Sequence, residues 1–231
     1  MTQLPLRVLQ TGTEEPLGES RELKAGPLTV FYEDGGLRYV RWGQREILRR
    51  VYVAVRDRNW KTLPTALTEL RIEAGADAFE LSFNADCLRG DIQFGWRGMI
   101  TGDSKGTIVF SMEGEAKTTF LRNRIGLCVL HPIKECAGRT CILERTSGAI
   151  NRGSFPRYIW AQQPFLDLKA ISHEVAPGIR ARVAFEGEVF EMEDQRNWAD
   201  ASYKIYGTPL HLPFPVEIKK GTQISQKVTL T

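Results

Sequence analysis

Acidic, basic and aromatic side chains are concentrated in one segment, FEMEDQRNWADASYK, which spans residues 190–204. Carboxylates that crowd together repel one another unless they are paired, and this repulsion can raise the pKa of one of them. A carboxylate tuned in this way suits a general base that activates water. The alternative is an ion-paired bulge, in which Arg196 and Lys204 neutralise their acidic neighbours. The residues alone leave both interpretations open for the four carboxylates of the segment, Glu191, Glu193, Asp194 and Asp200.

A strand through this segment would divide its side chains into two sets, because successive residues of a strand point to opposite faces. One face would be wholly polar. The other would combine a charge pair with two apolar side chains. The polar set is Glu191, Glu193, Gln195 and Asn197, and the mixed set is Met192, Asp194, Arg196 and Trp198.

The run FLRNRIGLCVLHP, residues 120–132, ends in a histidine that directly precedes a proline. Period two puts Arg124 and Cys128 on one face of this expected strand, and Asn123 and His131 on the other. A histidine at the rim of a sheet can act as a general acid or base. The alternative is a structural histidine that bonds to a backbone carbonyl.

Arginine and asparagine stand next to each other in RDRNW, LRNRIG and DQRNW. Sugar recognition needs planar donors and acceptors for the hydroxyl groups, together with an aromatic surface for the C–H face of the ring. The alternative for a tryptophan in such a motif is a core position at the edge of a sandwich. The candidate binding residues are Arg58, Asn59, Arg124, Asn197, Trp198 and Lys204.

The elements that would position these side chains are strands. Apolar and polar residues alternate through RVYVAVR, AFELSFNA, DIQFGWRGMI, GTIVFSMEG and GTQISQKVTLT, and turn signals such as EDGGL and TGDSKGT separate the runs. Asp-Gly and Gly-Asp pairs between alternating runs are typical of antiparallel hairpins. PTALTEL is the best short helical candidate, and residues 144–165 interrupt the alternation as a long excursion of the kind that often carries binding function. We expect an all-β, antiparallel β-sandwich with very little helix.

Length, charge and cysteine usage restrict the class of protein. The 231 residues suit a single β-sandwich domain, placed at residues 26–231 after a loosely ordered lead-in at residues 1–25. A net charge of +3 is too weak to indicate a nucleic acid partner. The four cysteines include no CxxC pair, although Cys136 and Cys141 could approach each other. Without a signal-peptide core or the ~18 apolar residues of a membrane span, the expectation is a cytoplasmic protein with no membrane partner.

Three long stretches, FLRNRIGLCVLHP, FEMEDQRNWADASYKIYGTPL and LPFPVEIKKGTQISQKVTL, resemble the amino-terminal region of the D-apionate lactonase family. The resemblance extends from about Thr13 to Thr231. It implies hydrolysis of the branched-pentose lactone D-apionolactone to the open acid in bacterial apiose breakdown. Family members continue into a barrel-like domain, so the resemblance implies an amino-terminal portion or a shorter relative. A carboxy-terminal catalytic domain would then be the partner of this one.

The stretch GGLRYVRWGQREIL also resembles the opening strands of the galactose-mutarotase type of supersandwich. Enzymes on that scaffold pair a histidine acid with a carboxylate base over a sugar ring. The resemblance implies His131 and Glu193 as such a pair.

The leading hypothesis is a sugar-lactone hydrolase with no cofactor and no metal. Glu193 or Asp194 would deprotonate water, and His131 would protonate the leaving ring oxygen. If a metal were bound, these three residues would be its ligands. The alternatives are a non-catalytic β-sandwich that binds carbohydrate or packs on another domain, and a mutarotase-like aldose epimerase. The residues assigned to stabilising the oxyanion are Arg196, Arg124 and Lys204.

Overall fold

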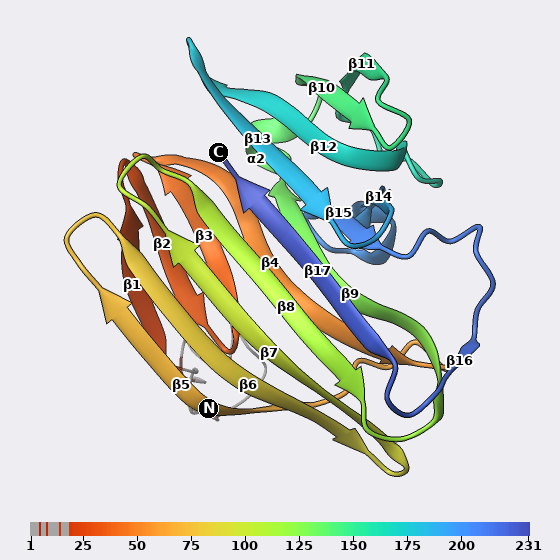
Figure 1. The fold of residues 1–231 in the computed structure, drawn as a ribbon. Helices are drawn as coiled ribbons and strands as arrows, with labels where there is room; N and C mark the ends of the chain where they lie inside the picture. The colour runs from red at the N-terminus through yellow and green to blue at the C-terminus, as the bar shows by residue number, and fades with distance from the viewer. Residues whose placement is uncertain (1–4, 6–7, 9–13, 15–18) are drawn as a thin grey trace.

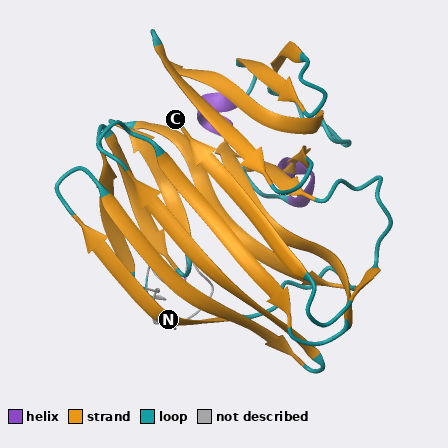
Figure 2. Ribbon diagram, in the orientation of Figure 1, coloured by secondary structure: helices purple, strands orange, loops and turns teal. Residues whose placement is uncertain are grey.

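The computed structural model describes residues 5, 8, 14 and 19–231, and strands make up most of it (Figure 2). Within the described residues, no helix is long and apolar enough to cross a membrane. The first nine strands are β1 (Ser20–Ala25), β2 (Leu28–Glu33), β3 (Gly36–Trp42), β4 (Arg45–Asp57), β5 (Thr65–Ala74), β6 (Phe79–Arg89), β7 (Ile92–Gly102), β8 (Ile108–Ala116) and β9 (Phe120–Pro132). They are followed by α2 (Ile133–Cys136), β10 (Thr140–Arg145), β11 (Ile150–Ser154), β12 (Phe165–Ala176), β13 (Ile179–Glu186), β14 (Phe190–Asp194), η1 (Gln195–Trp198), β15 (Ser202–Gly207), β16 (Val216–Ile218) and β17 (Gln223–Leu230).

Antiparallel pairing arranges these strands in two ladders that converge on β12. One ladder runs β5–β6–β7–β8–β17–β13–β12, and the other runs β1–β2–β3–β4–β9–β15–β14–β12. Figure 1 shows them as two facing layers, with β5–β8 and β17 in front of β1–β4 and β9. The strands β10–β15 form the upper part of the molecule. The predicted all-β sandwich with very little helix is confirmed.

Apolar side chains from both layers meet in one continuous core. Burial alternates along the central strands, as in β6 from Phe79 to Cys87 and in β8, where every second residue is buried. Each ladder therefore gives one face to the core, and the hydrophobic effect fixes which face it is. Large side chains in the core include Leu37, Phe83, Phe94, Phe110 and Ile125.

Two local expectations differ from the structure. Ser20–Ala25 form β1 rather than part of a loose lead-in, because Leu23 and Ala25 are buried and the strand pairs with β2 along its whole length. The remainder of the expected lead-in lies largely outside the described residues. Most of the helical candidate PTALTEL forms the start of β5 instead, since Thr65 to Thr68 pair with β6. Cys136 and Cys141 are buried free thiols, and burial raises the pKa of each.

A buried glutamine fixes the backbone of β9 at its centre. The side chain of Gln226, on β17, accepts a 2.8 Å hydrogen bond from the Leu127 N–H and donates a 3.4 Å bond to the Ile125 carbonyl. Gly126 lies between these two residues with a φ of 151°, a backbone angle that residues with a side chain rarely adopt. A Cβ at this position would overlap the Gln226 carboxamide. The carboxamide and the glycine together allow β9 to pass close to β17.

Replacing Gly126 with alanine is expected to lower the free energy of unfolding by about 1–3 kcal/mol, the cost of overpacking a filled interior. Chemical denaturation of the purified chain measures this loss. Gly43→Ala is the matched control, because Gly43 also has a positive φ but faces open space. Equal losses in the two variants would mean that backbone strain, and not contact with Gln226, sets the requirement for glycine.

Candidate functional site

A cavity of about 520 Å³ opens on the outer face of four adjacent strands, β4, β9, β15 and β14. Its floor is low because the central side chains are small. Most of the remaining lining residues have long or aromatic side chains, and they surround the floor. The floor residues are Ala54, Gly126 and Cys128, and the walls are Arg56, Trp60, Arg124, Glu193, Gln195, Trp198, Lys204, Tyr206, Gly207 and Leu210.

Strand register explains why these residues meet. Arg124 is opposite Arg56, Cys128 is opposite Tyr206, and Lys204 is opposite Glu193. Residues directly opposite each other in antiparallel strands share a face. The neighbours of Arg124 and Cys128 in the chain, such as Ile125, point into the core instead. The outer face therefore collects polar side chains from four strands.

Glu193 is the only carboxylate that lines this cavity among the described residues. The Trp198 indole N–H donates a 2.8 Å hydrogen bond to Glu193 Oε1. The Lys204 ammonium lies 3.6 Å from Glu193 Oε2 and 5.1 Å from the centroid of the Tyr206 ring. A carboxylate and an ammonium thus lie side by side at the cavity wall, in a position to act on one bound molecule.

Arg124 lies at the other wall, between two aromatic rings. Its guanidinium carbon is 5.4 Å from the Trp60 ring centroid and 5.1 Å from that of Phe214, distances typical of cation–π contacts. It donates hydrogen bonds of 2.7 Å to the Asn123 carbonyl and 3.0 Å to the Pro209 carbonyl. Burial lowers the pKa of this guanidinium from its ordinary value.

A second carboxylate, Glu191, lies buried behind the cavity and fixes its rim. It accepts 2.7 Å hydrogen bonds from the Tyr206 hydroxyl and from the Leu210 N–H. Burial, and then the bond to Glu191, raises the pKa of Tyr206. The contacts hold the loop after β15 against the strand, so that Tyr206 and Leu210 keep their places in the cavity wall.

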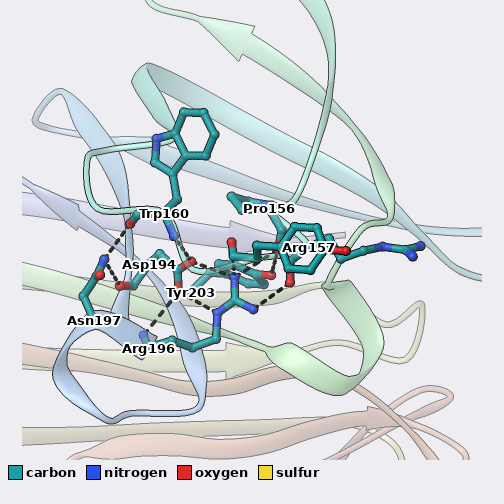
Figure 3. A network of polar contacts seen from close by, with 8 residues as sticks. Pro156, Arg157, Trp160, Asp194, Arg196, Asn197 and Tyr203 are labelled. Carbon is teal, nitrogen blue, oxygen red and sulfur yellow. Dashed lines mark hydrogen bonds and ion pairs between the residues drawn. The ribbon is translucent and has the colours of Figure 1, made fainter.

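Asp194 and Arg196 hold a different segment, the loop at residues 155–164, and do not line the cavity. In Figure 3 the Arg196 guanidinium lies between Asp194 and this loop. It forms two hydrogen bonds of 2.8 and 2.7 Å with the Asp194 carboxylate and donates to the Pro156, Arg157 and Tyr158 carbonyls. The Asp194 carboxylate also accepts a 2.9 Å hydrogen bond from the Trp160 N–H. These two residues therefore act as a structural ion pair.

The Asp194 carboxyl group is fully buried, which by itself raises its pKa. Hydrogen bonds from the Arg196 side chain, the Trp160 N–H and the Arg196 N–H outweigh burial and hold the pKa below its usual range. The crowding of carboxylates seen in the sequence is thus resolved by separate partners. Glu191 has Tyr206, Glu193 has Lys204 and Trp198, and Asp194 has Arg196.

His131 does not reach the cavity. It is fully buried, and neither ring nitrogen has a hydrogen-bond partner among the described residues. Its ring lies 5.6 Å from those of Phe155 and His173. It is opposite Tyr203 in the strand register, whereas Glu193 is opposite Lys204, so His131 and Glu193 point to opposite faces of the sheet. The acid–base pair that the resemblance implied is therefore not assembled.

Three of the remaining candidates lie near the cavity without lining it. Asn59 belongs to a turn in which its N–H donates a 2.8 Å hydrogen bond to Asp57, and the Arg58 carbonyl accepts a bond from Asn123. Asn197 donates to the Trp160 and Asp194 carbonyls. Arg124, Glu193, Trp198 and Lys204 are the sequence candidates that the structure brings together.

Sequence reasoning missed several lining residues. Trp60 follows Asn59 directly in the RDRNW motif, and Tyr206 follows Lys204 at the strand period of two. The period-two pattern already put Cys128 on the same face as Arg124, and Gly126 lies between them on that face. Arg56 begins the same RDRNW motif, although only its pairing with Arg124 brings it to the cavity.

No group of three or more metal-ligating side chains lies close together among the residues that the structure describes. The ligand set considered from the sequence, His131 with Glu193 and Asp194, is divided between the two faces of the sheet. The cavity chemistry available from this chain is that of one carboxylate, three cations and two tryptophans.

Sequence comparison gives one family and one curated relative. The family described as D-apionate lactonase, N-terminal domain, matches residues 8–231. The D-apionate lactonase of Brucella anthropi is 39% identical to this chain over 220 residues, which is 95% of the chain. The match covers 36% of the relative, so the chain spans little more than a third of that protein's length.

Several solved structures share the fold of this chain. A putative aldose 1-epimerase from Escherichia coli K12 superposes with a TM-score of 0.59 at 11% identity, covering 92% of this chain and 98% of that one. The Slr1438 protein from Synechocystis sp. PCC 6803 gives 0.55 at 8% identity, covering 100% and 99%. A galactose mutarotase-like protein from Lactobacillus casei ATCC 334 gives 0.52 at 7% identity, covering 92% and 100%. At such identities the likeness concerns the fold alone, and it confirms the predicted supersandwich.

Replacing Arg196 with alanine is expected to cost about 3–5 kcal/mol of unfolding free energy, because the buried Asp194 carboxylate would lose its charge partner. Urea denaturation followed by tryptophan fluorescence measures the loss. Arg157→Ala is the matched control, since the Arg157 side chain is exposed and only its carbonyl joins the network. Similar stabilities for the two variants would contradict a structural role for the ion pair.

Acid is expected to destabilise the fold through the two buried histidines. Burial, with His173 nearby, lowers the pKa of His131 well below 6.5, and burial lowers that of His173 to about 4. The unfolded chain therefore binds more protons, so the stability these groups contribute is complete above about pH 6.5 and decreases below it.

Denaturation at a series of pH values between 7 and about 4.5 would measure this decrease, and His131→Phe should reduce its slope. His211→Phe makes the same change at an exposed position and should leave the slope unchanged. An unchanged slope in His131→Phe would exclude His131 as a source of acid sensitivity.

Proposed function

The chain belongs to the D-apionate lactonase family, as its motifs predicted, and from this premise we propose that its cavity binds a sugar lactone and opens the ring by hydrolysis. The supporting observation is the group formed by Glu193, Lys204 and Trp198, which places a carboxylate, a cation and an aromatic surface at one wall of the cavity. The cavity volume of about 520 Å³ falls within the range of small-molecule sites.

In the proposed reaction Glu193 takes a proton from water, and the resulting hydroxide attacks the lactone carbonyl carbon. The carbonyl oxygen becomes an oxyanion that the Lys204 ammonium and the Arg124 guanidinium stabilise. The bond from the carbonyl carbon to the ring oxygen then breaks, and the ring oxygen receives the proton from Glu193. One water is consumed and the open hydroxy acid is released. Trp198 and Trp60 present their ring faces to the C–H face of the sugar.

The proposal assigns no catalytic role to His131, Asp194 or Arg196. Their side chains point into the core or toward the loop at residues 155–164. The same carboxyl group, Glu193, both accepts and returns the proton, so a separate general acid is not required for the balance of the reaction.

A second candidate function is a binding domain without catalysis of its own. It is favoured by the length of the Brucella anthropi relative, of which this chain matches only 36%. In that case a further, carboxy-terminal domain would carry out the hydrolysis, and the cavity described above would bind carbohydrate or face that domain. A cytoplasmic location belongs to the proposal, since all four cysteines are free thiols, as expected in a reducing compartment.

The test is an assay of D-apionolactone hydrolysis by the 231-residue chain and by Glu193→Gln. The variant is expected to lose about 10²–10⁴-fold in rate, the usual contribution of a general base. Glu186→Gln is the control, because Glu186 is an exposed carboxylate that pairs with Lys227 away from the cavity. Thermal melts of all variants establish that they are folded.

Full activity in Glu193→Gln would overturn the assignment of the base. Lactone binding without turnover by the wild-type chain would favour the binding domain. Exchange of anomers of a simple aldose, with no opening of the lactone, would favour the mutarotase-like epimerase.

A further inference from the structure

The cavity carries an excess of positive charge. Three cationic side chains line it, Arg56, Arg124 and Lys204, against the single carboxylate of Glu193. That carboxylate is already engaged by Lys204 and by the Trp198 indole. Like charges repel one another strongly where solvent is partly excluded. The three cations therefore favour the binding of an anion, which would offset their repulsion.

Arg124 contributes most to this excess, because its side chain is largely withdrawn from water. The residue is only 5% exposed, and no acidic side chain lies within ion-pair distance of it among the described residues. Glu191, a carboxylate that acts on the Arg124 charge, has its own partners in Tyr206 and the Leu210 N–H. A buried cation is costly unless it is paired, and here the pair is incomplete.

The hydrogen bonds of Arg124 are also incomplete. A guanidinium has five N–H donors. The described contacts use one from each terminal nitrogen, on the Asn123 and Pro209 carbonyls, while Nε has no partner. The two bonds to carbonyls and the flanking rings of Trp60 and Phe214 hold the group in one orientation. Nε is itself withdrawn from solvent, so the remaining N–H of each terminal nitrogen is the donor left for a carboxylate, which can accept two parallel bonds.

We propose that this cavity is a binding site for a small polyhydroxy carboxylate, with Arg124 as the anchor of the carboxylate and Lys204 and Arg56 as supporting charges. The inference deepens the function proposed above and rests on it for the class of ligand, since hydrolysis of a sugar lactone yields such an acid. The two tryptophans, Trp60 and Trp198, lie at the cavity wall where the carbon chain of the acid would extend.

This site has a consequence for the reaction. A lactone is neutral, whereas its product is an anion, so a cavity with excess positive charge holds the product more tightly than the substrate. Hydrolysis is therefore expected to be inhibited by its own product, and more strongly at low ionic strength than at high ionic strength.

The experiment is isothermal titration of the 231-residue chain with D-apionate, D-apionolactone and D-apiose, with inorganic phosphate as a further anion. D-Apionate is expected to bind about 10–100-fold more tightly than D-apiose, because its carboxylate forms charge-assisted hydrogen bonds. Added salt should weaken the binding of D-apionate but not the binding of the neutral D-apiose and D-apionolactone. Arg124→Gln should remove this preference while changing D-apiose affinity less than about twofold. Arg124→Lys should restore part of it, because the charge returns without the planar fork.

Arg97→Gln is the matched control, because Arg97 is exposed on β7 and lies outside the cavity. Thermal melts separate loss of binding from loss of the fold in the Arg124 variants. Equal affinities for D-apionate and D-apiose in the wild type, or a preference that survives Arg124→Gln, would overturn the inference. Tight binding of phosphate with none of D-apionate would also overturn it.

The two proposals fail differently. Acid-selective binding through Arg124 in a chain that hydrolyses no lactone would retain the acid site and reject catalysis by this chain. Lactone hydrolysis with acid binding that is independent of Arg124 would retain catalysis and reject the acid site.

Discussion

The antiparallel register of β9, β15 and β14 is the constraint on which the cavity depends. It sets Lys204 against Glu193 and brings Arg124 and Cys128 onto the same face. Because side chains alternate along a strand, the same register sends His131 to the opposite face. A slip of one residue in any of these strands would exchange the two sets, burying charges in the core and exposing apolar side chains. The hydrophobic core thus fixes the chemistry of the cavity, although it contributes no atom to it.

Polar groups around the cavity serve two separate purposes. Glu193 and Lys204 line the cavity, where a ligand can reach them. Glu191 and Asp194 are buried and satisfied by protein donors, and they hold the segments that form the rim. Such fully partnered carboxylates give rigidity because each broken bond would leave a buried acceptor without a partner. The rim is therefore built before any ligand arrives.

The scaffold shared with the solved structures does not decide the reaction. Those structures superpose over nearly the whole chain at 11% identity or less, so the sandwich alone is what they have in common. A sandwich of this kind presents a concave outer face whose side chains can change without affecting the core. In this chain that face combines Glu193 with an excess of arginine and lysine, and the proposed function follows from those side chains.

Much of the fold could be predicted from the sequence, because alternation and turn residues are local signals. They gave the all-β sandwich, and the long motifs gave the family. The best short helical candidate, PTALTEL, forms no helix, because pairing with β6 outweighs its weak helical pattern. The expected lead-in at residues 1–25 included Ser20–Ala25, which form β1. The sequence did not indicate this strand, because the burial of Leu23 and Ala25 depends on strands far away in the chain.

The candidate site was predictable only in part. The sequence by itself determined that Glu193, Asp194 and Arg196 would lie close together, and that Arg124 and His131 would occupy opposite faces of one strand. Only the tertiary structure decided that Arg196 would neutralise Asp194 while Glu193 remains in the cavity. That choice depends on the register between strands and on the loop at residues 155–164, whose carbonyls bind Arg196. Such contacts join residues about forty positions apart, and no local pattern in the chain encodes them.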